Sequence, residues 1–127
     1  MPGPLLFEYA VIRLVPRVER EEFLNVGVVL YCSGKKFLHA KFHLDKTRLS
    51  AFTDKLDVDE IGEYLRAFEG ICIGNKEVSP IARMPIAERF RWLTATRSTV
   101  VQSSKVHPGL CTDPGETLER LYGELVL

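Results

Sequence analysis

The segment from Arg89 to Asp113 holds most of the residues that could do chemistry in this chain. Within it, the run Arg97-Ser98-Thr99 places a guanidinium group next to two hydroxyl groups. An arginine fork with neighbouring hydroxyl donors can hold a phosphate or carboxylate group. In a turn, the same Ser98 and Thr99 side chains would instead bond to nearby backbone groups. The run therefore predicts an anion site, with a local turn as the alternative.

Three residues elsewhere could complete such a site. Arg13 is a lone cation on the apolar face of an expected strand, and Asn25, just before the next strand, could reach the same pocket or bond a turn. His107, within a turn-forming His-Pro-Gly sequence, could act as an acid or base, although a plain turn is the simpler interpretation. The ligand-binding candidates are therefore Arg13, Asn25, Arg97, Ser98, Thr99 and His107.

A second kind of site is indicated by Arg89 and Trp92. They lie three residues apart and would share one face of a short helix for which Pro85 suits the first position. An exposed tryptophan beside an arginine is typical of a protein interface. Both residues are interface candidates, with a core position as the alternative for Trp92.

Composition and charge place the chain among soluble globular proteins. Hydrophobic residues make up 46% of the 127 residues, and 17 basic residues balance 17 acidic ones. A net charge of zero gives no overall attraction to nucleic acids or membranes. Because the sequence shows no signal peptide and no membrane-spanning stretch, we expect a cytoplasmic protein with a single domain over residues 1–127.

Charge is nevertheless distributed unevenly. Residues 83–105 carry five cations and one anion (net +4), whereas residues 45–69 carry four cations and seven anions (net −3). Residues 113–127 carry one cation and four anions (net −3). Such a surface can attract an anionic ligand or an acidic patch of a partner. Alternatively, the basic segment pairs with the acidic helices inside the same fold.

The three cysteines, Cys32, Cys72 and Cys111, include no Cys-x-x-Cys pair, so a disulfide scaffold or a zinc site is not expected. Cys111 lies in the polar segment and is the first candidate for a functional thiol. His39 and His43 would lie about 13 Å apart on a strand, too far to share a metal ion. No phosphate-binding glycine loop or nucleophile elbow is present, so neither a metal nor a cofactor is predicted.

The apolar pattern predicts an α+β fold with a mostly antiparallel sheet. A short turn should make the second and third strands a hairpin that the first strand joins, and one later strand should follow. Gly27 predicts a bulge or a close backbone approach. Strands are predicted at residues 6–16, 25–32, 37–44 and 99–106.

About three helices should pack on this sheet. Asp57 and Asp113 each begin a capping box, so a helix should start after each of them. Gly74 or Asn75 should end the first of these helices. The short helix at Pro85 is the third, and a weaker pattern predicts one more at residues 47–52.

Four long segments, at residues 8–16, 22–29, 89–102 and 106–114, carry a resemblance to a known family. Through them, nearly the whole chain resembles a small bacterial family known as domain of unknown function 3037. The family has no established activity, so no catalytic residue is carried over. The resemblance implies a bacterial cytosolic protein. It also implies a partner, because such proteins are often encoded beside kinases that resemble the HipA toxin kinase.

Two functions are consistent with these observations. The first is a non-enzymatic interaction domain, an accessory partner of a HipA-like kinase, with Arg89 and Trp92 at the interface. The second is a small phosphate- or nucleotide-binding domain, perhaps an enzyme, in which Arg97 clamps the anion and His107 acts as acid or base. RNA binding is a weaker third, supported only by Trp92 and the basic run.

Overall fold

The computed structural model describes residues 3–16, 22–53, 57–95 and 99–127. Its centre is an antiparallel sheet in which β1 (Leu5–Leu14) pairs with β2 (Leu24–Cys32), and β2 pairs with β3 (Phe37–Phe42). A 3-10 turn at Ser33–Lys35 joins β2 to β3. The predicted α+β class and the meander of three strands are confirmed.

Two short strands share the other side of β1. β4 (Val101–Ser103) pairs with residues 12–14 and β5 (His107–Cys111) pairs with residues 5–9, so the two lie end to end along β1. The prediction of a single strand at 99–106 followed by a turn is therefore wrong. β5 pairs with β1 alone, and an edge strand tolerates the missing N–H of Pro108.

Both features predicted at Gly27, a bulge and a close backbone approach, are confirmed. The β1–β2 register shifts at this point, because Ile12 pairs with Gly27 whereas Arg13 pairs with Asn25, which leaves one extra residue on β2. A side chain at Gly27 would overlap the ring of Phe42 and come within 2.9 Å of a backbone oxygen of β3. The bulge turns the start of β2 and helps to place Asn25.

The two longest helices begin as predicted. α2 (Val58–Ile73) and α4 (Pro114–Leu125) are capped by Asp57 and Asp113, and each carboxylate accepts two backbone N–H bonds. Gly74 ends α2 in the left-handed conformation, with φ of 78°. These caps fix where both helices start and where α2 stops.

The two shorter α-helices form in the regions where the sequence predicted short helices. α1 (Lys46–Phe52) begins after Asp45, and α3 (Ile86–Leu93) begins after Pro85. A 3-10 turn at Pro80–Arg83 leads into α3. Because α1 forms, the described chain has four α-helices rather than about three.

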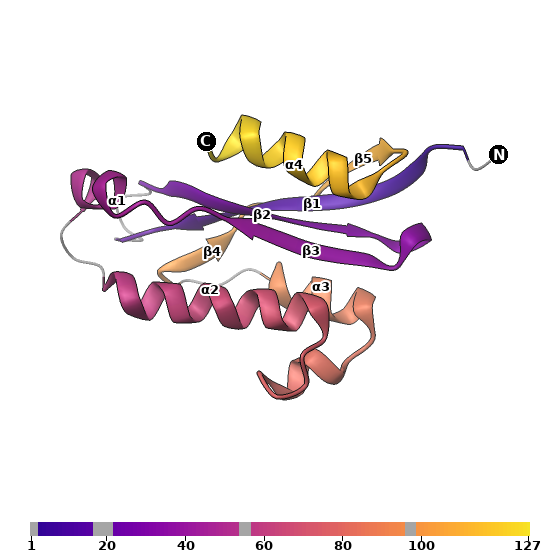
Figure 1. Cartoon of the computed structure of the whole chain (residues 1–127), viewed down its shortest axis with the longest axis horizontal. Helices are drawn as coiled ribbons and strands as arrows, with labels where there is room; N and C mark the ends of the chain where they lie inside the picture. The colour runs from indigo at the N-terminus through magenta and orange to yellow at the C-terminus, as the bar shows by residue number, and fades with distance from the viewer. Residues whose placement is uncertain (1–2, 17–21, 54–56, 96–98) are drawn as a thin grey trace.

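Helices cover both faces of the sheet (Figure 1). α4 packs on one face against β2 and β3, and α2 and α3 lie on the opposite face. Strand alternation therefore divides the apolar residues into two clusters, one facing α2 and α3 and one facing α4. β2 contributes to both clusters, because apolar residues occupy both of its faces, as is usual for a central strand. None of the described helices is long and apolar enough to cross a membrane.

Candidate functional site

Arg13 and Asn25 lie opposite each other on β1 and β2, so the structure brings these two ligand candidates together. Asn25 Nδ2 donates a hydrogen bond to the carbonyl oxygen of Leu125 at 3.0 Å, which secures the end of α4. The guanidinium carbon of Arg13 lies 4.0 Å from the ring centre of Phe23. Burial lowers the pKa of Arg13 from its ordinary value. Asn25 therefore has a structural role whether or not a ligand binds.

The other described candidates do not join this pair. His107 lies on β5 opposite Tyr9, and the two ring centres are 5.3 Å apart. Tyr9 is four residues from Arg13 along β1, a separation of about 13 Å. Thr99 Oγ1 donates to the carbonyl oxygen of Val101 at 2.7 Å, which is the local bonding that the turn alternative requires. Arg97 and Ser98 lie outside the described residues.

The basic segment around α3 is engaged within the fold. Arg89 Nη1 donates to the carbonyl oxygens of Ile71 and Cys72 at 3.0 and 3.2 Å, so it caps the end of α2. Arg91 forms two hydrogen bonds of 2.8 Å with the carboxylate of Glu8 on β1. Of the two interface candidates, Arg89 is half-buried in a structural contact, whereas Trp92 is 38% exposed.

All three cysteines are buried. Cys111 packs in the apolar cluster against α4, which corrects the expectation that its polar neighbours would leave it available. Burial raises the pKa of Cys111 and raises that of Cys72 to about 12. Because the thiolate is the reactive form, neither side chain is a ready nucleophile in the folded protein.

His39 lies on β3 and His43 lies just after it, and each contacts a neighbouring side chain. The ring centres of His39 and Phe37 are 4.6 Å apart, and His43 Nε2 lies 3.9 Å from Asp45 Oδ2. Within the described ranges, no three His, Cys, Asp or Glu side chains gather closely enough to hold a metal ion.

A groove lies between α2, α3 and β4 on the described surface and is here called the α2–α3 groove. It consists of two adjoining pockets that share Tyr64, Phe68 and Leu93. The larger one has an empty volume of ≈ 440 Å³, part of which is open to solvent. The remaining lining residues are Ile12, Ala67, Ile71, Ser79, Trp92, Ala95, Val101, Gln102 and Ser103.

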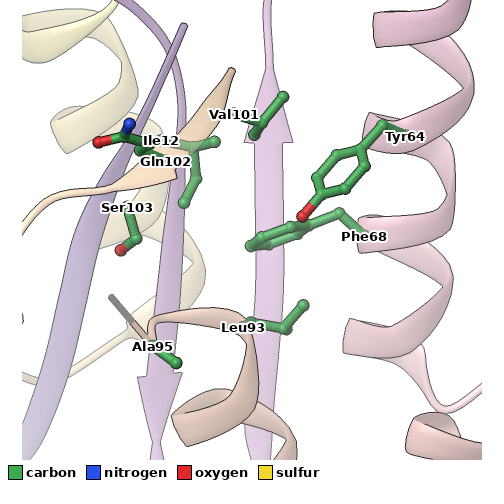
Figure 2. A pocket seen from close by; sticks show the side chains of 8 residues that line it. All are labelled: Ile12, Tyr64, Phe68, Leu93, Ala95, Val101, Gln102 and Ser103. Carbon is green, nitrogen blue, oxygen red and sulfur yellow. The ribbon is translucent and has the colours of Figure 1, made fainter. Parts of the chain in front are cut away.

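The larger pocket of the α2–α3 groove is mostly apolar, whereas Gln102 and Ser103 make the smaller pocket partly polar, and no charged side chain is among the described residues that line either one. Figure 2 shows the rings of Tyr64 and Phe68 extending from α2 towards β4, whereas the amide of Gln102 points away from them. Tyr64 and Trp92 are 40% and 38% exposed, so an aromatic side chain stands on each helix bordering the groove. Such a lining suits an apolar side chain of a ligand, and its described residues offer no acid, base or anion clamp.

Sequence reasoning found Trp92 and missed Tyr64. The available signal was helical spacing, because Tyr64 and Ile71 lie seven residues apart, next to the core stripe of α2. That spacing reports which side of the helix a residue occupies. It does not report that α3 leaves this side partly uncovered.

Comparison with protein families gives one match, over residues 9–126, to the model described as "Protein of unknown function (DUF3037)". Neither a curated protein nor a solved structure matches the chain. The matched residues include all four helices and every strand except the first residues of β1. With nearly the whole fold inside the match, the chain belongs to the DUF3037 family.

Proposed function

We propose that this chain is a non-enzymatic interaction domain that binds a partner protein through the α2–α3 groove. The partner we propose is a kinase resembling the HipA toxin kinase, for which the chain would be an accessory subunit. The observation that carries the proposal is that Tyr64 and Trp92, both partly exposed, border a groove whose described lining residues include no charged group.

Aromatic side chains that border an apolar hollow are the usual anchors of protein interfaces. They provide a large contact area at a small cost in side-chain entropy, and a few of them account for most of the binding energy. A site for a phosphate-bearing ligand would instead need converging cations. His107 pairs with Tyr9, which is about 13 Å from Arg13 along β1, and this separation supports the interaction domain over the anion site.

The test is a calorimetric titration of the purified HipA-like kinase into the protein and into its Trp92→Ala variant. We expect a complex with one kinase per chain. Removing the indole should weaken binding roughly 30-fold or more, the effect of losing an interface anchor of about 2 kcal/mol.

Phe23→Ala is the matched control. Phe23 is an exposed aromatic residue, 47% accessible, that lies beside Arg13 and outside the groove. Its removal should leave the affinity unchanged. Because Trp92→Ala could disturb folding, Trp92→Phe and a thermal melt of each variant accompany the titration. The proposal would be ruled out if the kinase showed no binding to the protein, or if it bound Trp92→Ala as tightly as the wild type.

A further inference from the structure

The charge nearest to the α2–α3 groove lies on its border, because the described residues that line it carry none. Three of the lining residues on the two helices have a glutamate four residues earlier in the sequence: Tyr64 follows Glu60, Ala67 follows Glu63 and Trp92 follows Glu88. Residues four apart lie on the same face of a helix, one turn from each other. The three glutamates therefore border the groove and are here called the acidic rim.

The carboxylates of the acidic rim are available to a partner. All three residues are exposed. The ion pairs among the described residues use other carboxylates, namely those of Glu8, Asp45, Glu119 and Glu124. The acidic rim is thus not neutralised by an ion pair within the described part of the chain.

The cations of the same two helices are directed elsewhere. Arg66 is the one cation of α2, and its Nη1 lies 3.3 Å from the place where a side chain at Gly62 would begin. Gly62 and Tyr64 are two residues apart, so they lie on opposite sides of the helix. On α3, Arg89 is bonded to the end of α2 and Arg91 is bonded to a carboxylate on β1.

The sign of the acidic rim is therefore opposite to that of the segment that contains α3. Residues 83–105 carry a net charge of +4 in the sequence, but the two arginines of α3 are engaged within the fold. Arg83 and Lys105 are exposed, and neither lines the groove. Folding thus leaves an apolar groove that is bordered by negative charge.

We propose that the α2–α3 groove binds a basic amphipathic helix of its partner, whose apolar side chains enter the groove while its lysine or arginine side chains face the acidic rim. This inference rests on the proposed function, because it uses the same groove, and it adds the chemistry of the bound segment. Apolar anchors supply most of the affinity of an interface, whereas complementary charges at its edge speed association and exclude partners of the wrong sign.

The size of the groove suits a short helical segment. Tyr64 and Ile71 are the outermost lining residues on α2 and are seven residues apart, a distance of about 10 Å along the helix. Two apolar side chains one turn apart on a bound helix would fill this length. Binding of an amphipathic helix in an apolar groove is an established mode of recognition, read through anchors at helical spacing.

The test uses Trp92 as the reporter, since it is the only tryptophan of the chain and lines the groove. The probe is a peptide of about twelve residues, or roughly three helical turns, with two leucines one turn apart, lysines beside them and alanines elsewhere. A second peptide has glutamate in place of every lysine. We expect a saturable change in Trp92 fluorescence with the basic peptide and none with the acidic peptide at the same concentrations.

A variant without the acidic rim tests the charge from the side of the protein. It combines Glu60→Gln, Glu63→Gln and Glu88→Gln, which keep the shape of each side chain and remove its charge. Affinity for the basic peptide should fall about tenfold at low ionic strength, the combined effect of three exposed ion pairs. The difference between this variant and the wild type should shrink as salt is added.

The matched control changes the net charge equally on the other side of the sheet. It combines Glu116→Gln, Glu119→Gln and Glu124→Gln on α4, which packs on the face opposite α2 and α3 (Figure 1). This control should bind the basic peptide like the wild type. Thermal melts check that both variants are folded.

The inference would be overturned if the two peptides bound equally well, or if loss of the acidic rim left the affinity for the basic peptide unchanged. It would also be overturned if Trp92 fluorescence did not respond to the basic peptide at millimolar concentration. The kinase titration decides the proposed function separately. A kinase that binds the wild type and not Trp92→Ala, together with any of these results, would keep the groove as the interface and remove the selection by charge.

Discussion

Arg89 Nη1 donates a hydrogen bond to the carbonyl oxygen of Ile71 at 3.0 Å and thereby ties α3 to the last turn of α2. Gly74 makes this contact possible, because a side chain there would come within 2.8 Å of the same nitrogen. The α2–α3 groove lies between these two helices. The residue that the sequence indicated as an interface position is thus one that fixes the shape of the groove.

Arg89→Ala should lower the free energy of unfolding by roughly 1–3 kcal/mol, because carbonyl groups at the end of α2 lose a charged donor. Urea unfolding measures the change. Arg83→Ala is the matched control, since this exposed arginine lies in the turn before α3 and should cost less than about 0.5 kcal/mol. Equal effects of the two variants would show that the cap contributes nothing specific.

Asn25→Ala should loosen the end of α4, because the carbonyl oxygen of Leu125 loses the donor at 3.0 Å. The expected cost is about 1 kcal/mol, together with faster hydrogen exchange at the amide of Val126, which bonds to Tyr122. Asn75→Ala removes an amide from an exposed turn after α2 and should leave exchange in α4 unaltered. Unchanged protection of Val126 in Asn25→Ala would contradict the assignment.

Gly27→Ala should destabilise the protein by about 1–3 kcal/mol, because the added methyl group meets the ring of Phe42 and a backbone oxygen of β3. Gly123→Ala is the opposite case. No atom lies within 4 Å of the site of the added methyl group, and the position is in α4. The substitution should therefore stabilise the protein by about 0.5–1 kcal/mol. Thermal melts of the two variants should therefore shift in opposite directions, and a shift of both in the same direction would refute this account.

Burial of Cys72 predicts a dependence of stability on alkaline pH. Its pKa is about 12 in the folded protein against an ordinary value of 9.0, so the unfolded chain loses this proton first as the pH rises. The contribution of Cys72 to the free energy of unfolding is complete below about pH 9 and is lost as the pH rises towards 12, by about 1.4 kcal/mol per pH unit.

Urea unfolding of the wild type and of Cys72→Ala across this range checks the prediction. The difference between the two free energies should move in favour of the variant as the pH rises. Curves that stay parallel would show that the thiol ionises as easily in the folded protein as in the unfolded chain. The comparison is made as a difference because lysine and tyrosine side chains also titrate at alkaline pH.

Local signals predicted most of the fold. Asp57 and Asp113 fix the starts of their helices through their own backbone neighbours, and Gly74 ends α2 through its own conformation. These features need only a few adjacent residues, so a sequence displays them directly. The failure at Pro108 and Gly109 has the opposite cause. Their local preference is a turn, but they pair with β1, which is distant in the sequence, and this pairing overrides the local preference.

The candidate site was predicted less well, since it depends on packing between distant segments. Trp92 was identified by its type, whereas Tyr64 became notable only once α3 and β4 lay beside α2. The predictions for the polar candidates were correct in part. Arg13 and Asn25 were expected to be close and are paired. His107 lies on β5 beside Tyr9, away from Arg13, because the register of β5 on β1 decides its position.

The end-to-end placement of β4 and β5 along β1 also affects how the protein is made. On the ribosome, β1 emerges early and can pair at once with β2, but its other side must wait for residues 101–111. At roughly 5–20 residues per second, synthesis of the intervening chain takes roughly 5–20 s. During that interval the nascent hairpin has an unfilled side and is exposed to chaperones and to mispairing. The sheet can close only after residues 101–111 have been synthesised.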